Sequence, residues 1–148
     1  MFFPGGFPQP MKTFLGYVTT GYGLATPNLN PVMSLIESRI GLAHLVPGTL
    51  NVRIPEDYIV PPDALILPHE YPYNRQSQLG ETIKLQRCLV AGYRGIVVRP
   101  DSHENGAGQF HGKACLELMG QIHFRSALHL ADGSPIEVQV EGAGSWWA

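Results

Sequence analysis

Short apolar runs that alternate with polar residues dominate this chain, and they predict a protein built mainly from β-strands. Successive side chains of a strand point to opposite faces, so alternation is typical of a strand with one buried face. Such runs occupy residues 49–54, 64–67, 82–90, 93–99, 114–119 and 135–140. The turn-forming residues that separate them are Pro61-Pro62, Pro68, Pro72, Gly92 and Asp132-Gly133.

A seventh strand is predicted at Lys12–Thr20, near the start of the chain. Two sets of residues alternate along it, Phe14, Gly16 and Val18 against Leu15 and Tyr17. Because both sets contain apolar side chains, we expect both faces of this strand to be partly covered.

One amphipathic helix is predicted at residues 31–40. Asn30 is a residue type favoured at helix N-caps, and Pro31 suits the first helical position. The apolar residues then repeat at helical spacing, as Met33, Ile36 and Ile40, with Leu35 widening the stripe. Gly41 is placed to end the helix. The apolar stripe indicates that the helix covers one mouth or side of the sheet.

Many short strands with one or two helices predict a small closed β-barrel. A second short helix fits residues 122–128, with Phe124 and Leu128 facing inward. The length of 148 residues suits a single domain with one core. We expect three parts: a flexible N-terminal extension at 1–10, the barrel domain at 11–141 and a C-terminal tail at 142–148.

Composition and charge exclude several classes of function. The net charge of −2 provides no basic field for nucleic acid or an anionic membrane. No apolar run reaches membrane-spanning length, and residues 1–10 lack the basic start of a signal peptide. Cys88 and Cys115 stand too far apart for a zinc motif or a disulfide framework, which suits a reduced cytoplasm. Trp146 and Trp147 either pack on the domain, which is favoured, or mark a weak self-association patch.

The tetrapeptide Gly48-Thr49-Leu50-Asn51 places two hard oxygen donors two residues apart at the start of an extended run. In a strand, Thr49 Oγ1 and Asn51 Oδ1 would point the same way. Neutral oxygens of this kind suit a Mg²⁺ ion that takes its other ligands from water and substrate phosphates. Thr and Asn at a strand entry are also common turn-makers, so both interpretations stay open.

A glycine-rich segment follows the first strand, with the sequence Gly21-Tyr22-Gly23-Leu24-Ala25-Thr26. Successive backbone N–H groups in such a loop can bind an anion, and small side chains let a phosphate approach. The segment is not a Walker A loop, because no Gly-Lys-Ser/Thr follows, and it lacks the context of a dinucleotide fingerprint. Phosphate binding and a glycine-rich hairpin turn both remain possible for this segment alone.

Residues 100–103 predict a polar turn where a strand ends at a proline. The glycine-rich stretch 104–113 that follows has the composition of a flexible lid. Asp101, His103 and His111 could be read as a transition-metal site, but their spacing matches no zinc motif.

Glu117 lies between two leucines in an apolar run. A charged side chain in this position either faces water or lines a pocket. The sequence alone favours exposure to water.

The order of these features resembles the CTP-dependent riboflavin kinases, a family best known from archaea. The matching motifs are Gly-x-Val-x-x-Gly-x-Gly at 16–23, Pro-Gly-Thr-Leu-Asn-Val at 47–52, Val-Val-Arg-Pro followed by Ser-His within 97–103, Leu-Glu-Leu at 116–118, and Phe-Arg-x-x-Leu-x-Leu-x-Asp-Gly at 124–133. The resemblance covers about residues 12 to 140. The Gly-Thr-Leu-Asn block and the order of the motifs are its most specific parts.

The resemblance implies a six-stranded barrel of the cradle-loop type, with nucleotide and flavin sites along its loops. Residues 21–26 would wrap the nucleotide diphosphate, and Thr49 and Asn51 would ligate Mg²⁺. Ser102 and Glu117 would hold riboflavin, which for Glu117 reverses the expectation of exposure. The residues lining the cytidine nucleotide would be Ile122, His123, Phe124 and Arg125, with Arg125 bonding a base edge or a phosphate.

The implied reaction moves the γ-phosphate of CTP to the 5′-hydroxyl of riboflavin and gives FMN and CDP. The preference for CTP rests on the resemblance alone. Four departures from the family pattern stand out: Ala25 replaces a glycine, Ser102 replaces a threonine, the loop 101–113 is long, and the N-terminal extension is unfamiliar. Two alternatives therefore stay open, a non-catalytic nucleotide- or flavin-binding module and a related small-molecule kinase with another acceptor.

Overall fold

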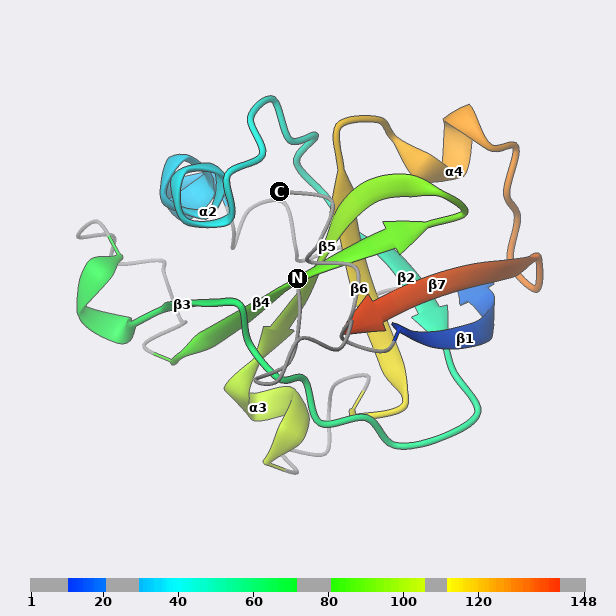
Figure 1. Ribbon diagram of the computed structural model, residues 1–148, viewed down its shortest axis with the longest axis horizontal. Coiled ribbons are helices and arrows are strands. Elements are labelled where there is room, and N and C mark those ends of the chain that lie inside the picture. The colour runs from blue at the N-terminus through cyan, green and yellow to red at the C-terminus, as the bar shows by residue number, and fades with distance from the viewer. Residues whose placement is uncertain (1–10, 21–29, 72–80, 106–111, 142–148) are drawn as a thin grey trace, which may run out of the picture.

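The computed structural model describes residues 11–20, 30–71, 81–105 and 112–141. Its strands are β1 (Met11–Thr19), β2 (Leu50–Arg53), β3 (Ala64–Ile66), β4 (Ile83–Val90), β5 (Tyr93–Pro100), β6 (Cys115–Gly120) and β7 (Pro135–Glu141). Six of these form an antiparallel barrel in the order β4-β5-β6-β2-β1-β7, and the pairing of β7 with β4 closes the ring (Figure 1). The short strand β3 pairs with the first half of β4.

All seven strands predicted from the alternating pattern are confirmed, with ends that differ by one residue at most. The expected covering of both faces of β1 is wrong. Leu15 and Tyr17 are 58% and 54% exposed, because no other element packs on that face of β1 within the described residues. The predicted tails, including Trp146 and Trp147, lie outside the described residues.

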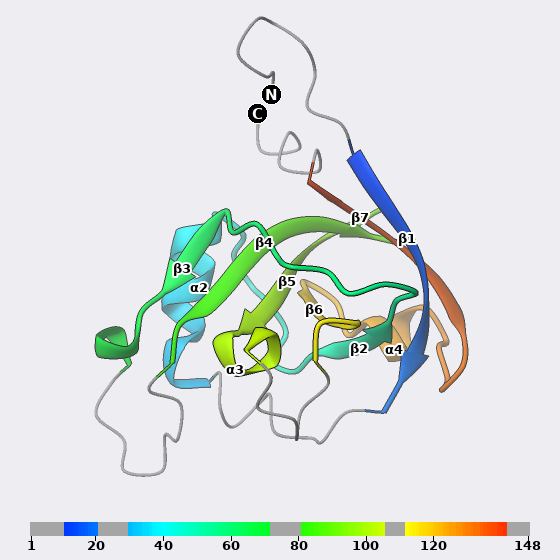
Figure 2. The same ribbon diagram turned by 90° about the horizontal axis from the view of Figure 1, so that it is seen from below.

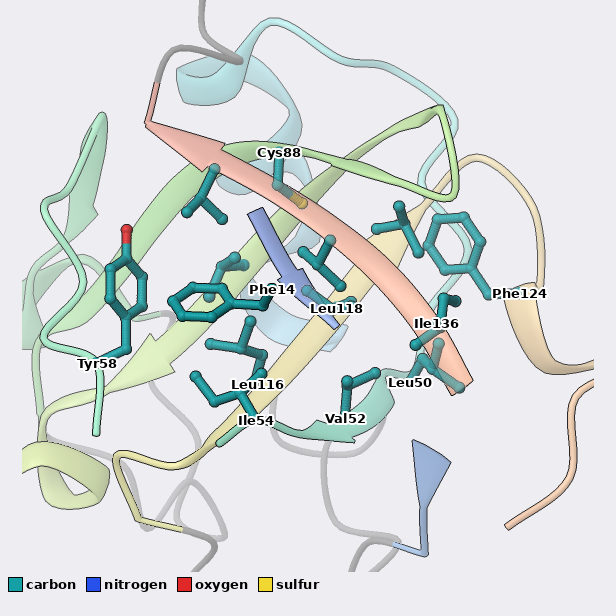
Figure 3. Packing of buried hydrophobic residues seen from close by; sticks show 14 of the residues in the cluster. Phe14, Leu50, Val52, Ile54, Tyr58, Cys88, Leu116, Leu118, Phe124 and Ile136 are labelled. Atoms are coloured by element: carbon teal, nitrogen blue, oxygen red, sulfur yellow. The ribbon is translucent and has the colours of Figure 1, made fainter. Parts of the chain in front are cut away.

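The barrel interior is a packed hydrophobic core built from alternate residues of the strands (Figure 3). The strand residues in this core are Phe14, Val18, Leu50, Val52, Cys88, Val90, Val97, Leu116, Leu118, Ile136, Val138 and Val140. Phe14 meets Tyr58 edge to face, with ring centroids 5.1 Å apart. Gly16 permits the close approach of β1 to β2, since a Cβ there would lie 2.4 Å from Val52 Cγ1.

A second apolar layer covers part of the outer face of the barrel. It lies beneath a 3₁₀ turn, η1 (Asn30–Val32), and the helix α2 (Met33–Ile40), which together confirm the predicted helix. Ile36 and Ile40 are fully buried against outer-face residues of β4, β5 and β6. Gly41 ends α2 in a left-handed conformation, with φ of 75°. Asn30 does not cap α2, because Val32 occupies the N-cap position.

Three further short elements connect the strands: η2 (Pro68–Glu70), α3 (Asp101–Glu104) and α4 (Phe124–Ala127). α4 confirms the helix predicted at 122–128, with Phe124 buried and Leu128 packed on the barrel core. The polar turn predicted at 100–103 is instead the single helical turn α3. A helix this short has little stability of its own, so tertiary contacts must hold it in place.

A buried ion cluster supplies those contacts for α3. The Arg99 side chain is 1% exposed, and its guanidinium donates to Glu104 Oε2 at 3.0 Å and to the carbonyl oxygen of Tyr58 at 2.7 Å. Glu104 also accepts from Lys84 Nζ and from the backbone N–H of Val60. Burial alone would raise the pKa of Glu104, but these partners lower it below its ordinary value. Glu104 is therefore an anchor of α3, although the sequence suggested that it begins a flexible lid.

We expect Glu104→Gln to lower the free energy of unfolding by about 3 kcal/mol, because it leaves the Arg99 charge buried without its counter-charge. Urea denaturation at neutral pH measures the change. Glu56→Gln is the matched control, since the Glu56–Lys12 pair is exposed, and it should cost less than about 1 kcal/mol. Equal effects of the two substitutions would contradict a structural role for the buried pair.

Candidate functional site

A row of polar residues crosses three neighbouring strands on the outer face of the barrel. Thr19 of β1 lies directly opposite Asn51 of β2, and Asn51 lies opposite Glu117 of β6. Directly paired residues of antiparallel strands share a face. Because the flanking residues of β2 and β6 fill the barrel interior, this row points outward. The row continues to Val98 of β5, which belongs to the layer beneath α2.

Glu117 is the centre of this row and is largely buried, with a side chain only 13% exposed. Thr49 Oγ1 donates to its Oε1 at 3.4 Å, and His103 Nδ1 lies 3.4 Å from its Oε2. Burial raises the pKa of the Glu117 carboxyl to about 7, while the Thr49 hydroxyl and the charge of Arg99 oppose this shift. The exposure favoured by the sequence alone is wrong, because α3 brings His103 over this position.

Asn51 carries a buried oxygen that has no hydrogen-bond partner among the described residues. The residue is 8% exposed. An unsatisfied buried carbonyl oxygen costs about 1–3 kcal/mol, and this oxygen is chemically available as a donor to a ligand. Thr49, which immediately precedes β2, offers a second neutral oxygen. These donors fit the hard-oxygen preference of Mg²⁺.

Ser102 lies next to His103 in α3 and contacts a residue that the sequence analysis missed. Its backbone N–H donates to Glu81 Oε1 at 2.7 Å, and its Oγ lies 3.2 Å from Glu81 Oε2. His103 was considered only as a metal ligand, and its position beside Glu117 was also missed. No local signal identifies either contact, since each joins residues far apart in the sequence.

The segment predicted to line the nucleotide connects β6 to α4. The ring of Phe124 fills the end of the barrel, where a Cβ on Gly120 would lie 2.4 Å from its Cζ. Because the Phe124 ring is buried in the core, only the backbone of Phe124 could contact a ligand. Ile122 is partly buried on the same core, while His123 is exposed and caps α4 by accepting from Ser126 N–H.

Arg125 joins α4 to the end of β1. Its Nη2 lies 2.7 Å from Asp132 Oδ1 and 3.5 Å from the carbonyl oxygen of Thr19. The hydroxyl of Thr20 donates to the same Asp132 carboxylate. The end of β1 is thus bonded to α4 on one side and paired with Asn51 on the other.

The predicted phosphate-binding residues Gly21, Tyr22, Gly23, Leu24, Ala25 and Thr26 lie outside the described residues. Thr20, the residue before them, is described and follows the end of β1. Figure 2 shows that α3, β2 and the end of β1 lie along one side of the barrel. The structure brings Thr49 and Asn51 together with Glu117, whereas the described hydrogen bonds of Ser102 are to Glu81.

No group of three histidine, cysteine or carboxylate side chains suited to a metal occurs among the residues that the structure describes. Asp101 and His103 are both in α3, while His111 lies outside that part of the chain. In the same residues, no helix has the length and apolar character needed to cross a membrane.

A comparison with protein-family models gives one match. The model CTP-dep_RFKase, described as a domain of unknown function, DUF120, matches residues 18–140. The matched region runs from the end of β1 to the end of β7 and includes every predicted site residue. No curated protein matches the chain.

We expect Glu117→Gln to remove a pH dependence of stability that the unmodified chain shows without added metal. Because burial raises the pKa of this carboxyl from 4.5 to about 7, the folded state retains a proton that the unfolded state releases. Stability is therefore lost as pH rises between these two values. The variant should match the unmodified chain near pH 4 and exceed its free energy of unfolding by about 3 kcal/mol near pH 8.

Urea denaturation at a series of pH values, in the presence of a chelator, measures this difference. A difference between the two chains that stays constant with pH would contradict the burial of an ionisable Glu117.

Proposed function

Since this chain belongs to the CTP-dependent riboflavin kinase family, we propose that it transfers the γ-phosphate of CTP to the 5′-hydroxyl of riboflavin. The products are FMN and CDP. The observation that carries the proposal is the unpartnered, buried Oδ1 of Asn51, which lies between the end of β1 and Glu117. On this proposal, an oxygen donor for the metal would stand between the nucleotide and the flavin.

On the nucleotide side, residues 21–26 follow the end of β1 and would supply backbone N–H groups to the phosphates. Arg125 lies beside the same strand end. It would give up its contact with Asp132 and bond a base edge or a phosphate of the nucleotide instead. Side-chain ion pairs as exposed as this one contribute little stability, so the exchange costs little.

On the flavin side, Ser102 and Glu117 would hold riboflavin. Both lie next to His103, Ser102 in sequence and Glu117 in space. A hydroxyl and a carboxyl group provide donors and acceptors for the polar edge of the flavin or for its ribityl hydroxyls. The acceptor would then lie on the opposite side of Asn51 from the nucleotide phosphates.

Thr49 and Asn51 would hold Mg²⁺, which when bound neutralises charge on the phosphate oxygens. Phosphoryl transfer depends on positioning and charge neutralisation more than on covalent help from the protein. A bond forms between the ribityl 5′-oxygen and the γ-phosphorus, the bond to the β–γ bridging oxygen breaks, and the hydroxyl proton is released. We place this reaction in the cytoplasm, where the thiols of Cys88 and Cys115 would stay reduced.

We expect the protein to form FMN when incubated with riboflavin, Mg²⁺ and CTP, and to form little with ATP, GTP or UTP. Chromatography of the reaction mixture with fluorescence detection measures FMN. Binding of riboflavin and CTP without FMN would support a non-catalytic binding module instead. Phosphorylation of a different acceptor only would support a related kinase.

Asn51→Ala is expected to weaken binding of the magnesium nucleotide at least about tenfold, because it removes one of two protein ligands to the metal. Stability in chelator should change by less than about 1 kcal/mol, since the lost oxygen has no partner in the described residues. Titration of CTP with Mg²⁺ by calorimetry measures the affinity.

Thr49→Val provides a second test, because it removes the hydroxyl but keeps the branched shape. Thr13→Val is its matched control, since Thr13 is an exposed threonine on β1 far from the site. An Asn51→Ala or Thr49→Val variant with the CTP affinity of the Thr13→Val control would contradict the proposed metal site.

A further inference from the structure

We propose that His103 is a positioning residue of the flavin site, which fixes the orientation of the Glu117 carboxylate. The inference rests on the proposed function, because it concerns how the acceptor is held. Neither the family match nor the sequence pattern gives His103 this role.

The two oxygens of Glu117 have different partners on different elements. Oε1 lies against the Thr49 hydroxyl at the start of β2, and Oε2 lies against His103 Nδ1 of α3, each at 3.4 Å. A glutamate side chain has three rotatable bonds, and holding it in one orientation costs conformational entropy. Contacts at both oxygens select one orientation, in which the carboxylate bridges the metal side and the flavin side of the site.

His103 is itself held firmly, which makes it suited to this task. The residue is 8% exposed and lies in the middle of α3. The helix is fixed at its start by the Asp101 N–H bond to the carbonyl oxygen of Thr82, and at its end by Glu104 in the buried ion cluster. A residue that is locked by its surroundings can orient a neighbour to the precision that binding requires.

The distance between His103 and Glu117 is longer than that of a good hydrogen bond. Contacts between active-site residues are often long in the absence of ligand and shorten when the substrate binds. We therefore expect the contact to matter most in the complex with riboflavin. The magnesium nucleotide, which lies on the Thr49 side of the carboxylate, should be affected little.

The test compares two substitutions. His103→Leu fills a similar volume without a polar atom, whereas His103→Asn keeps a nitrogen donor near the position of Nδ1. Riboflavin affinity is measured by fluorescence quenching, the affinity for CTP with Mg²⁺ by calorimetry, and kcat and KM by FMN formation. His69→Leu, on an exposed histidine of η2, is the matched control.

We expect His103→Leu to weaken riboflavin binding and raise its KM at least about tenfold, with CTP affinity within about twofold of the unmodified chain. His103→Asn should stay within about threefold for both ligands, and His69→Leu should change neither. Riboflavin binding by His103→Leu equal to that of the control would overturn the inference. So would equal losses in the Leu and Asn variants, which would show that His103 acts only by packing.

The unmodified chain separates this inference from the proposed function. If it forms FMN and His103→Leu is unaffected, only the role of His103 fails. If it neither binds riboflavin nor forms FMN, the proposed function fails and the inference fails with it.

Discussion

The burial of Arg99 against Glu104 is the interaction on which the arrangement of the site depends. Arg99 projects from β5 and bonds backbone carbonyls of the loop after β2 and of β6, while Glu104 ends α3. A buried ion pair of this kind often adds little net stability, because removing both charges from water is costly. The pair instead joins the end of α3 to a buried position of β5 and so holds α3 in place. That placement carries Ser102 and His103 to the site.

The barrel separates its structural and functional residues by strand alternation. Interior positions of β2 and β6 carry the hydrophobic core, and the positions between them carry Asn51 and Glu117 on the outer face. Helix α2 covers part of that face with apolar contacts and leaves the polar row at its margin. The polar side chains of the row are therefore partly sheltered from water without interrupting the core. Within the described residues, the buried Oδ1 of Asn51 in this row has no hydrogen-bond partner.

Most of the fold could be predicted from the sequence, because strand alternation and turn residues are local signals. The helix at 31–40 was equally accessible through the spacing of Ile36 and Ile40 and the glycine that ends it. The helix α3 could not be predicted, because four residues are too few to show a helical periodicity. Its conformation depends instead on Lys84 of β4 and Arg99 of β5, which both contact Glu104. The exposure of Leu15 and Tyr17 was also missed, because the pattern shows apolarity but not what covers it.

The candidate site was predicted in part. The resemblance named Thr49, Asn51, Ser102 and Glu117. The structure brings Thr49, Asn51 and Glu117 together and joins Ser102 to Glu81, while all contacts with ligands remain predictions. Glu81 and His103 were missed because their importance comes from pairing with Ser102 and Glu117 in space. The burial of Glu117 likewise depends on α3, so reasoning from its two leucine neighbours gave the wrong answer.

Phe124 has a consequence for the cost of ligand binding. Its ring occupies the space above Gly120 that a larger residue would fill, so the chain between Ile122 and Arg125 is tied to the hydrophobic core. A segment anchored in this way is preorganised and would lose little conformational freedom on binding the nucleotide proposed for it. More of the contact energy would then contribute to affinity, and a mutation that loosened the ring would weaken this proposed binding without removing a single contact to the ligand.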